Sequence, residues 1–177
     1  LVLQIANFAH SKGGMTKSLV LGKKTDIELT RRVAEAIDYI LFGCLVMGGL
    51  YFFSLYLLGN RDKAILLYAI YSIIYSYRII GVDNYVLHTI FPSFDWYIAV
   101  RLEYASLFIS IGFFALYTRY LYPEDVNKKI IEILSIICFT FATAAITIAP
   151  VYFTQLINPF LVVTLFCLVY VPHIYIV

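Results

Sequence analysis

Five long apolar stretches, separated by short polar segments, dominate the chain. A helix needs about 20 apolar residues to cross the roughly 30 Å hydrocarbon core of a membrane, and each stretch meets or approaches that length. The spacing predicts membrane-spanning helices over residues 36–58, 64–80, 97–122, 130–149 and 156–177. Strict apolar–polar alternation, the pattern of a membrane β-barrel, is absent. We therefore predict an all-α integral membrane helical bundle over residues 36–177.

The connections between these stretches carry turn-forming and charged residues. Residues 59–63, Gly-Asn-Arg-Asp-Lys, form a tight polar turn, and residues 81–95 form a longer loop. A segment that starts at Pro123 separates the third and fourth helices, and Pro150 to Pro159 form an almost uncharged turn. Glycine, proline and clustered polar residues are typical of such connections.

The first 35 residues have a different character. Two short apolar runs, residues 1–9 and 18–21, flank Gly13-Gly14 and indicate the last two strands of a β domain. Because so few residues cannot form a domain alone, we expect residues 1–24 to be a remnant whose other strands lie upstream. Thr25 and Glu28 have the spacing of a capping box, which predicts a linker helix over residues 25–35. We expect the sequence to be a fragment, because both ends lie in apolar runs and no signal peptide is present.

The composition agrees with a membrane protein. Hydrophobic residues make up 62% of the chain and charged residues 14%, against about 45–50% and about 25% in soluble domains, and the mean hydropathy is +0.87. The 13 Lys and Arg residues against 11 Asp and Glu leave a net charge of only +2, which argues against a nucleic-acid partner.

Neither the cysteines nor the histidines indicate a cofactor or a metal site. The cysteines stand singly in apolar runs, at Cys44, Cys138 and Cys167, without the paired spacing of a metal site, and we expect them to be buried. The histidines are His10, His88 and His173. We expect His88 and His173 near opposite membrane faces, too far apart to share a ligand, and their roles stay open. No nucleophile–base pair or phosphate loop is present, so we expect no enzyme activity in this segment.

Lysine and arginine accumulate in short cytoplasmic loops. After the first helix all loop cations fall on one side, at Arg61, Lys63, Arg119, Lys128 and Lys129. This places that side in the cytoplasm and the N-terminal segment outside. The N-terminal segment itself carries six Lys and Arg residues, which favour the reverse, so charge alone leaves the orientation open.

The candidate ligand or switch residues lie on the second and third predicted helices. Tyr71, Tyr75 and Arg78 share one helix face. They are either a polar stripe that responds to a ligand or an aromatic packing face whose arginine reaches the headgroups. Arg101 and Glu103 are charges inside the third helix, which usually face the protein interior with a partner. We expect Arg78 and Glu103 to approach each other, as a static contact or as part of a switch.

Small residues that suit close helix contacts in lipid occur on three predicted helices. They are Gly43, Gly48, Gly49, Ser106, Ser110, Ala145 and Ala149. They fit either packing inside the bundle or the seam of a homodimer.

Several short motifs resemble one receptor family. Residues 3–10, Gly13-Gly14 and residues 20–22 resemble the closing strands of a periplasmic jelly-roll sensor domain. That domain precedes the membrane part of bacterial seven-transmembrane receptors with diverse intracellular signalling modules. The membrane part resembles the same family at Gly43, residues 59–63, Tyr68, Tyr71, Gly81, Phe91-Pro92, Phe113-Phe114 and residues 119–121.

The resemblance implies a receptor of the bacterial inner membrane with its N-terminal segment in the periplasm. It implies seven helices, of which this sequence holds five, and a cytoplasmic output module such as a diguanylate cyclase or a histidine kinase. The jelly-roll likeness favours a carbohydrate as the periplasmic ligand. We predict a segment that couples a periplasmic sensor to this output. The alternative is a fragment of a membrane transporter or channel, which would favour broken helices and inverted repeats.

Overall fold

The computed structural model describes residues 20–59, 61–82 and 86–176 and is helical almost throughout. Its elements are α1 (Lys24–Leu57), α2 (Lys63–Gly81), α3 (Val86–Ile90), α4 (Trp96–Leu121), α5 (Lys128–Thr147), α6 (Pro150–Phe153), η1 (Thr154–Leu156) and α7 (Ile157–Ile176). Five of these segments are long and apolar enough to cross a membrane: α1, α2, α4, α5 and the run Pro150–Val171. The predicted all-α bundle, with five helices able to span a membrane, is confirmed for the described residues.

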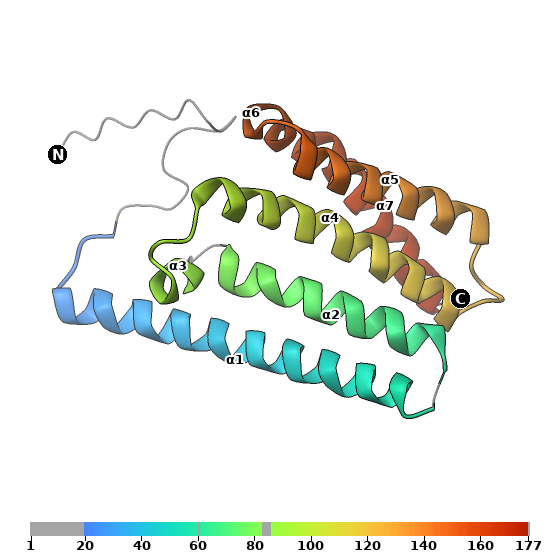
Figure 1. Ribbon diagram of the computed structural model, residues 1–177, viewed down its shortest axis with the longest axis horizontal. Coiled ribbons are helices and arrows are strands. Elements are labelled where there is room, and N and C mark those ends of the chain that lie inside the picture. The colour runs from blue at the N-terminus through green and yellow to red at the C-terminus, as the bar shows by residue number, and fades with distance from the viewer. Residues whose placement is uncertain (1–19, 60, 83–85, 177) are drawn as a thin grey trace.

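The helices α1, α2, α4 and α5 lie side by side in one row, and α7 lies behind α4 and α5 (Figure 1). The α3 end of the bundle holds α3 and the starts of α1 and α4. The turn end holds the short connections at residues 58–62 and 122–127. Because α4 contacts α2, α5 and α7, it is the central helix of the described chain.

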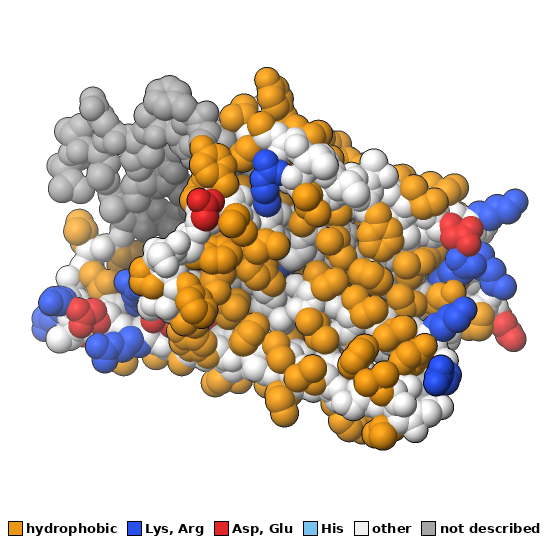
Figure 2. Space-filling model, in the orientation of Figure 1, with side chains coloured by type: hydrophobic (Ala, Val, Ile, Leu, Met, Phe, Trp, Pro, Cys, Tyr) orange, Lys and Arg blue, Asp and Glu red, His pale blue; other side chains and the backbone are white. Residues whose placement is uncertain are grey.

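The core lies between α4, α5 and α7 and is largely aromatic. Phe108 of α4 packs edge-to-face on Phe160 of α7, with ring centroids 4.4 Å apart. Tyr104 meets Phe153 of α6 at 5.3 Å. Most of the outward surface is hydrophobic as well, and the charges gather towards the two ends of the helices (Figure 2). This is the distribution that suits lipid around the bundle.

Polar side chains cap the starts of α2 and α4. The side-chain oxygen of Asp62 accepts from the backbone N–H of Ala64, and that of Asp95 accepts from Tyr97 and Ile98. Gly59, at φ +123°, makes the turn before α2, a backbone conformation that favours glycine.

The first helix departs from the expectation. The predicted capping box at Thr25 is wrong, because α1 begins at Lys24 and its N-cap Lys23 makes no side-chain cap bond. The Thr25 hydroxyl donates to Asp26 instead, and Glu28 pairs with Lys24 at 3.7 Å. The expected linker helix continues without a break into the first span, as one helix of 34 residues.

Three further differences concern the connections and the N-terminus. Residues 81–95, expected as a loop, contain α3, and residues 150–159, expected as a turn, are helical. Proline suits those positions, because Pro150 opens α6 and Pro159 lies in the first turn of α7, where backbone N–H groups have no partner within the helix. Most of the expected β remnant lies outside the described residues, and residues 20–23 form no strand.

Candidate functional site

The charged residues predicted inside the membrane lie near the α3 end, at the contacts of α4 with its two neighbours. Arg78 projects from the last turn of α2, and its Nη1 donates to the backbone carbonyl of Glu103, with a nitrogen–oxygen distance of 2.9 Å. The expected approach of Arg78 and Glu103 is therefore present. It uses the backbone of Glu103 rather than its carboxylate.

One more hydrogen bond joins the two helices at this contact. The Tyr77 hydroxyl donates to the carbonyl of Ala99, at 3.3 Å. The Glu103 carbonyl also accepts from the Ser106 hydroxyl within α4, at 3.1 Å. The end of α2 is thus tied to the first turns of α4 by side chains that bond to backbone oxygens. Such interhelical hydrogen bonds stabilise helix pairs in lipid.

Arg101 contacts a different helix. Its Nη1 donates to the carbonyls of Ala145, at 3.4 Å, and Ile146, and its guanidinium lies 5.8 Å from the ring centroid of Phe153. The last four carbonyls of a helix have no partner within it and carry a partial negative charge. Because the last turn of α5 has no basic residue of its own, Arg101 serves as its cap.

The contact of Arg101 with the end of α5 was not predicted from the sequence. The available signal was the uncharged end of the fourth apolar stretch, directly before Pro150, which leaves the carbonyls there to be satisfied from another helix. Arg101 and Glu103 therefore lie close in sequence and act on opposite neighbours of α4.

Tyr71 and Tyr75 belong to a row of aromatic rings. Their rings stack with centroids 5.6 Å apart, and Tyr71 contacts Phe114 of α4 at 5.4 Å. The row continues through Tyr68, which meets Tyr117 of α4 at 5.4 Å and Phe52 of α1 at 5.0 Å. These rings pack α1, α2 and α4 together, which favours the packing interpretation of the stripe. A role of these tyrosines as ligand or switch residues stays a prediction.

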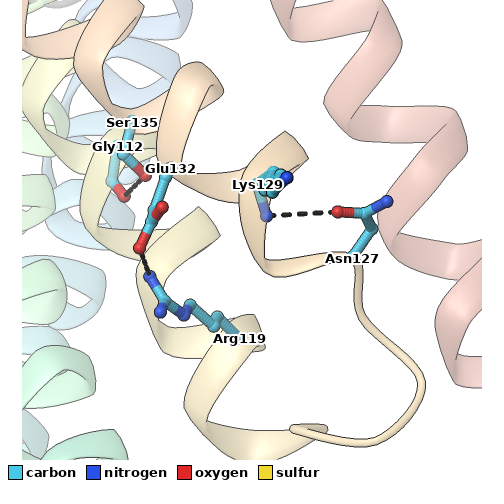
Figure 3. Close-up of polar contacts among 6 residues, drawn as sticks. All are labelled: Gly112, Arg119, Asn127, Lys129, Glu132 and Ser135. Carbon is cyan, nitrogen blue, oxygen red and sulfur yellow. Dashed lines mark hydrogen bonds and ion pairs between the residues drawn. The ribbon is translucent and has the colours of Figure 1, made fainter.

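At the turn end, α4 is tied to α5. Arg119 pairs with Glu132 at 2.6 Å, and the Ser135 hydroxyl donates to the Gly112 carbonyl at 3.4 Å further along (Figure 3). The Asn127 side chain caps α5 by accepting from the Lys129 N–H at 3.1 Å (Figure 3). With the Arg101 contact at the α3 end, α4 and α5 are joined at both ends.

Between α2 and α4 the turn end is more open. A groove of about 370 Å³ lies there, lined by residues that include Phe52, Tyr68, Tyr117 and Leu121. Ring and cation contacts also join the two helices at this end, where Tyr68 meets Tyr117 at 5.4 Å and Lys63 Nζ lies 5.5 Å from the ring centroid of Tyr120. The hydrogen bonds of Tyr77 and Arg78 to α4 lie at the α3 end. The contact between α2 and α4 is therefore hydrogen-bonded at the α3 end and aromatic, beside a groove, at the turn end.

The remaining candidates are the cysteines and the histidines. Within residues 20–59, 61–82 and 86–176, no three His, Cys, Asp or Glu side chains are grouped to hold a metal ion. Cys138 and Cys167 are buried, whereas Cys44 is exposed on α1, so the expected burial is wrong for Cys44. His10 and the side chains of His88 and His173 lie outside the described part of the structure.

Comparison with known proteins gives one match. No curated protein and no solved structure matches the chain significantly. A family model described as 7TM diverse intracellular signalling matches residues 34–177, from the first third of α1 to the end of the sequence. Because this match covers most of the chain and all five apolar helices, the protein belongs to the 7TM diverse intracellular signalling family.

Proposed function

We propose that this chain is the relay of a transmembrane signalling receptor in a bacterial inner membrane. Its α3 end faces the periplasm, where a sensory domain binds a ligand of the carbohydrate class, and its turn end faces a cytoplasmic output module. The family supports a signalling role, and the five cations at the turn end support a cytoplasmic position for that end. No specific observation favours the transporter or channel alternative.

The contacts that join α4 to α2 and α5 support a mechanism for the relay. Arg101 and Arg119 join α4 to α5 at both ends, so these two helices move as one unit. Arg78 and Tyr77 join α2 to α4 at the α3 end, and the groove beside Leu121 leaves room at the turn end. A shift of α1 at the periplasmic side therefore pivots α1–α2 about the Arg78 contact and changes the helix spacing at the cytoplasmic side.

Filling the groove tests this relay. In the full-length protein, we expect Leu121→Trp to hold α2 away from α4 and to fix the output in one state. The measurement is the transcript profile of the host strain, compared with wild type and with a deletion of the gene. Ile133→Trp is the matched control, because Ile133 is 59% exposed on α5, away from this groove. A Leu121→Trp profile identical to wild type would contradict the relay.

A labelling experiment tests the orientation. Lys24 starts α1 at the α3 end and Lys63 starts α2 at the turn end. With Cys44 replaced by alanine, we expect Lys24→Cys to react with a membrane-impermeant maleimide in spheroplasts, and Lys63→Cys to react only after lysis. The reverse pattern would place the N-terminal segment in the cytoplasm.

A further inference from the structure

A second groove, of about 530 Å³, lies between α2, α4 and the end of α5. Its walls are almost entirely apolar and include Ile74 of α2, Leu102 and Ile109 of α4 and Ile146 of α5. Several wall residues are open to the surroundings, since Leu102 is 41% and Ile146 is 56% exposed. In a membrane these residues face hydrocarbon, so the groove opens to the lipid.

The groove has the depth of one leaflet. Its α4 wall runs from Ile98 to Ile109, and the rise of about 1.5 Å per residue makes this about 16 Å. Half of the roughly 30 Å hydrocarbon core is about 15 Å. A single acyl chain lying along α4 therefore matches the length of the groove.

Arg101 places a cation near the headgroup end of this groove. Its contacts in the described residues are the two carbonyls at the end of α5, both reached through Nη1, and the ring of Phe153. No carboxylate of the described chain forms an ion pair with it. The partial charge of a helix end is about half an elementary charge, so a positive charge remains, and the guanidinium has further N–H donors in a fork that fits phosphate.

We propose that this groove binds one anionic phospholipid from the leaflet at the α3 end. Its phosphate contacts the Arg101 guanidinium, and one acyl chain lies between Ile74, Leu102 and Ile146. The charge of Arg101 selects an anionic headgroup, and the lateral opening supplies the lipid directly from the bilayer. The bound lipid would lie between α2 and α5, beside the contacts that α4 makes with these two helices.

The single tryptophan provides a reporter for this site. Trp96 starts α4, five residues before Arg101, or about 8 Å along the helix axis. The whole chain is reconstituted with mixtures of brominated phosphatidylglycerol and phosphatidylcholine, and quenching of Trp96 fluorescence gives the relative binding of the two lipids. We expect about a fivefold preference for phosphatidylglycerol, the ratio that corresponds to the roughly 1 kcal/mol contributed by one cation near an anionic lipid surface.

Two variants test the two halves of the site. Arg101→Gln removes the cation and is expected to bring the preference close to one. Leu102→Phe keeps the cation, narrows the groove with a larger side chain and is expected to lower the preference as well. Arg119→Gln, at the other end of the same helix, is the control and should leave the preference at Trp96 unchanged. Circular dichroism checks that each variant is folded. If Arg101→Gln does not fold, Leu102→Phe still tests the proposal.

Three results would overturn the proposal. The first is a preference for phosphatidylglycerol that survives both Arg101→Gln and Leu102→Phe. The second is an equal loss of preference in Arg119→Gln, which would indicate a general charge effect. The third is displacement of the brominated phospholipid by stoichiometric oleate, which would assign the groove to a free fatty acid.

Discussion

Arg78→Met is expected to destabilise the contact between α2 and α4 more than any change to the Glu103 side chain. The methionine keeps much of the apolar stem but loses the hydrogen bond to the Glu103 carbonyl. Hydrogen bonds of charged groups contribute about 1.5–3 kcal/mol each, and in lipid no water replaces the lost donor. Unfolding in mixed detergent micelles, followed by circular dichroism, measures the difference in free energy.

Glu103→Gln is the matched control for this prediction. It keeps the backbone carbonyl that accepts from Arg78 and from Ser106, so its effect should be clearly smaller than that of Arg78→Met. For the same reason, the exchanged pair Arg78→Glu with Glu103→Arg should not regain the stability of the wild-type protein. Full recovery in the exchanged pair would show that the carboxylate, not the carbonyl, is the partner of Arg78.

Gly49→Val is expected to separate α1 from α2. A Cβ atom at Gly49 would lie 2.7 Å from Cγ1 of Ile73 and 3.2 Å from the carbonyl oxygen of Ala69. Overpacking of this kind costs about 1–3 kcal/mol, and α1 has no other long helix of the described chain to compensate, since its packing is against α2. Thermal unfolding in detergent should show a lower midpoint.

Gly48→Val supplies the control, because a Cβ atom at Gly48 meets nothing within 4 Å. It makes the same change in helix propensity in the same helix. An equal loss of stability in both variants would show that the contact with Ile73 does not decide the effect.

The spans could be predicted from the sequence because lipid permits few structures. Once a stretch of about 20 apolar residues is present, the unsatisfied backbone leaves the helix as the only solution. The approach of Arg78 to Glu103 could be predicted because both were expected to enter the membrane from the same side. The atom that Arg78 contacts could not be predicted, since every residue has the same backbone carbonyl.

Contacts to the backbone explain the main omissions. Arg101 bonds to Ala145 and Ile146, two apolar residues whose side chains give no sign of an arginine partner. Likewise, Gly43, Gly48 and Gly49 look equivalent in the sequence, yet only Gly49 is buried against α2. Which of them makes the contact depends on the rotation of α1 about its axis, which is set by tertiary packing.

The unbroken length of α1 has a consequence for how force reaches the membrane. Its 34 residues measure about 51 Å at 1.5 Å per residue, some 20 Å more than the hydrocarbon is thick. The charged first turns, braced by the Arg31–Glu35 pair at 2.7 Å, therefore stand in water on the same rod that touches α2 at Gly49. Torque or axial load applied at Lys24 is therefore transmitted along an unbroken helix to Gly49, about 38 Å away.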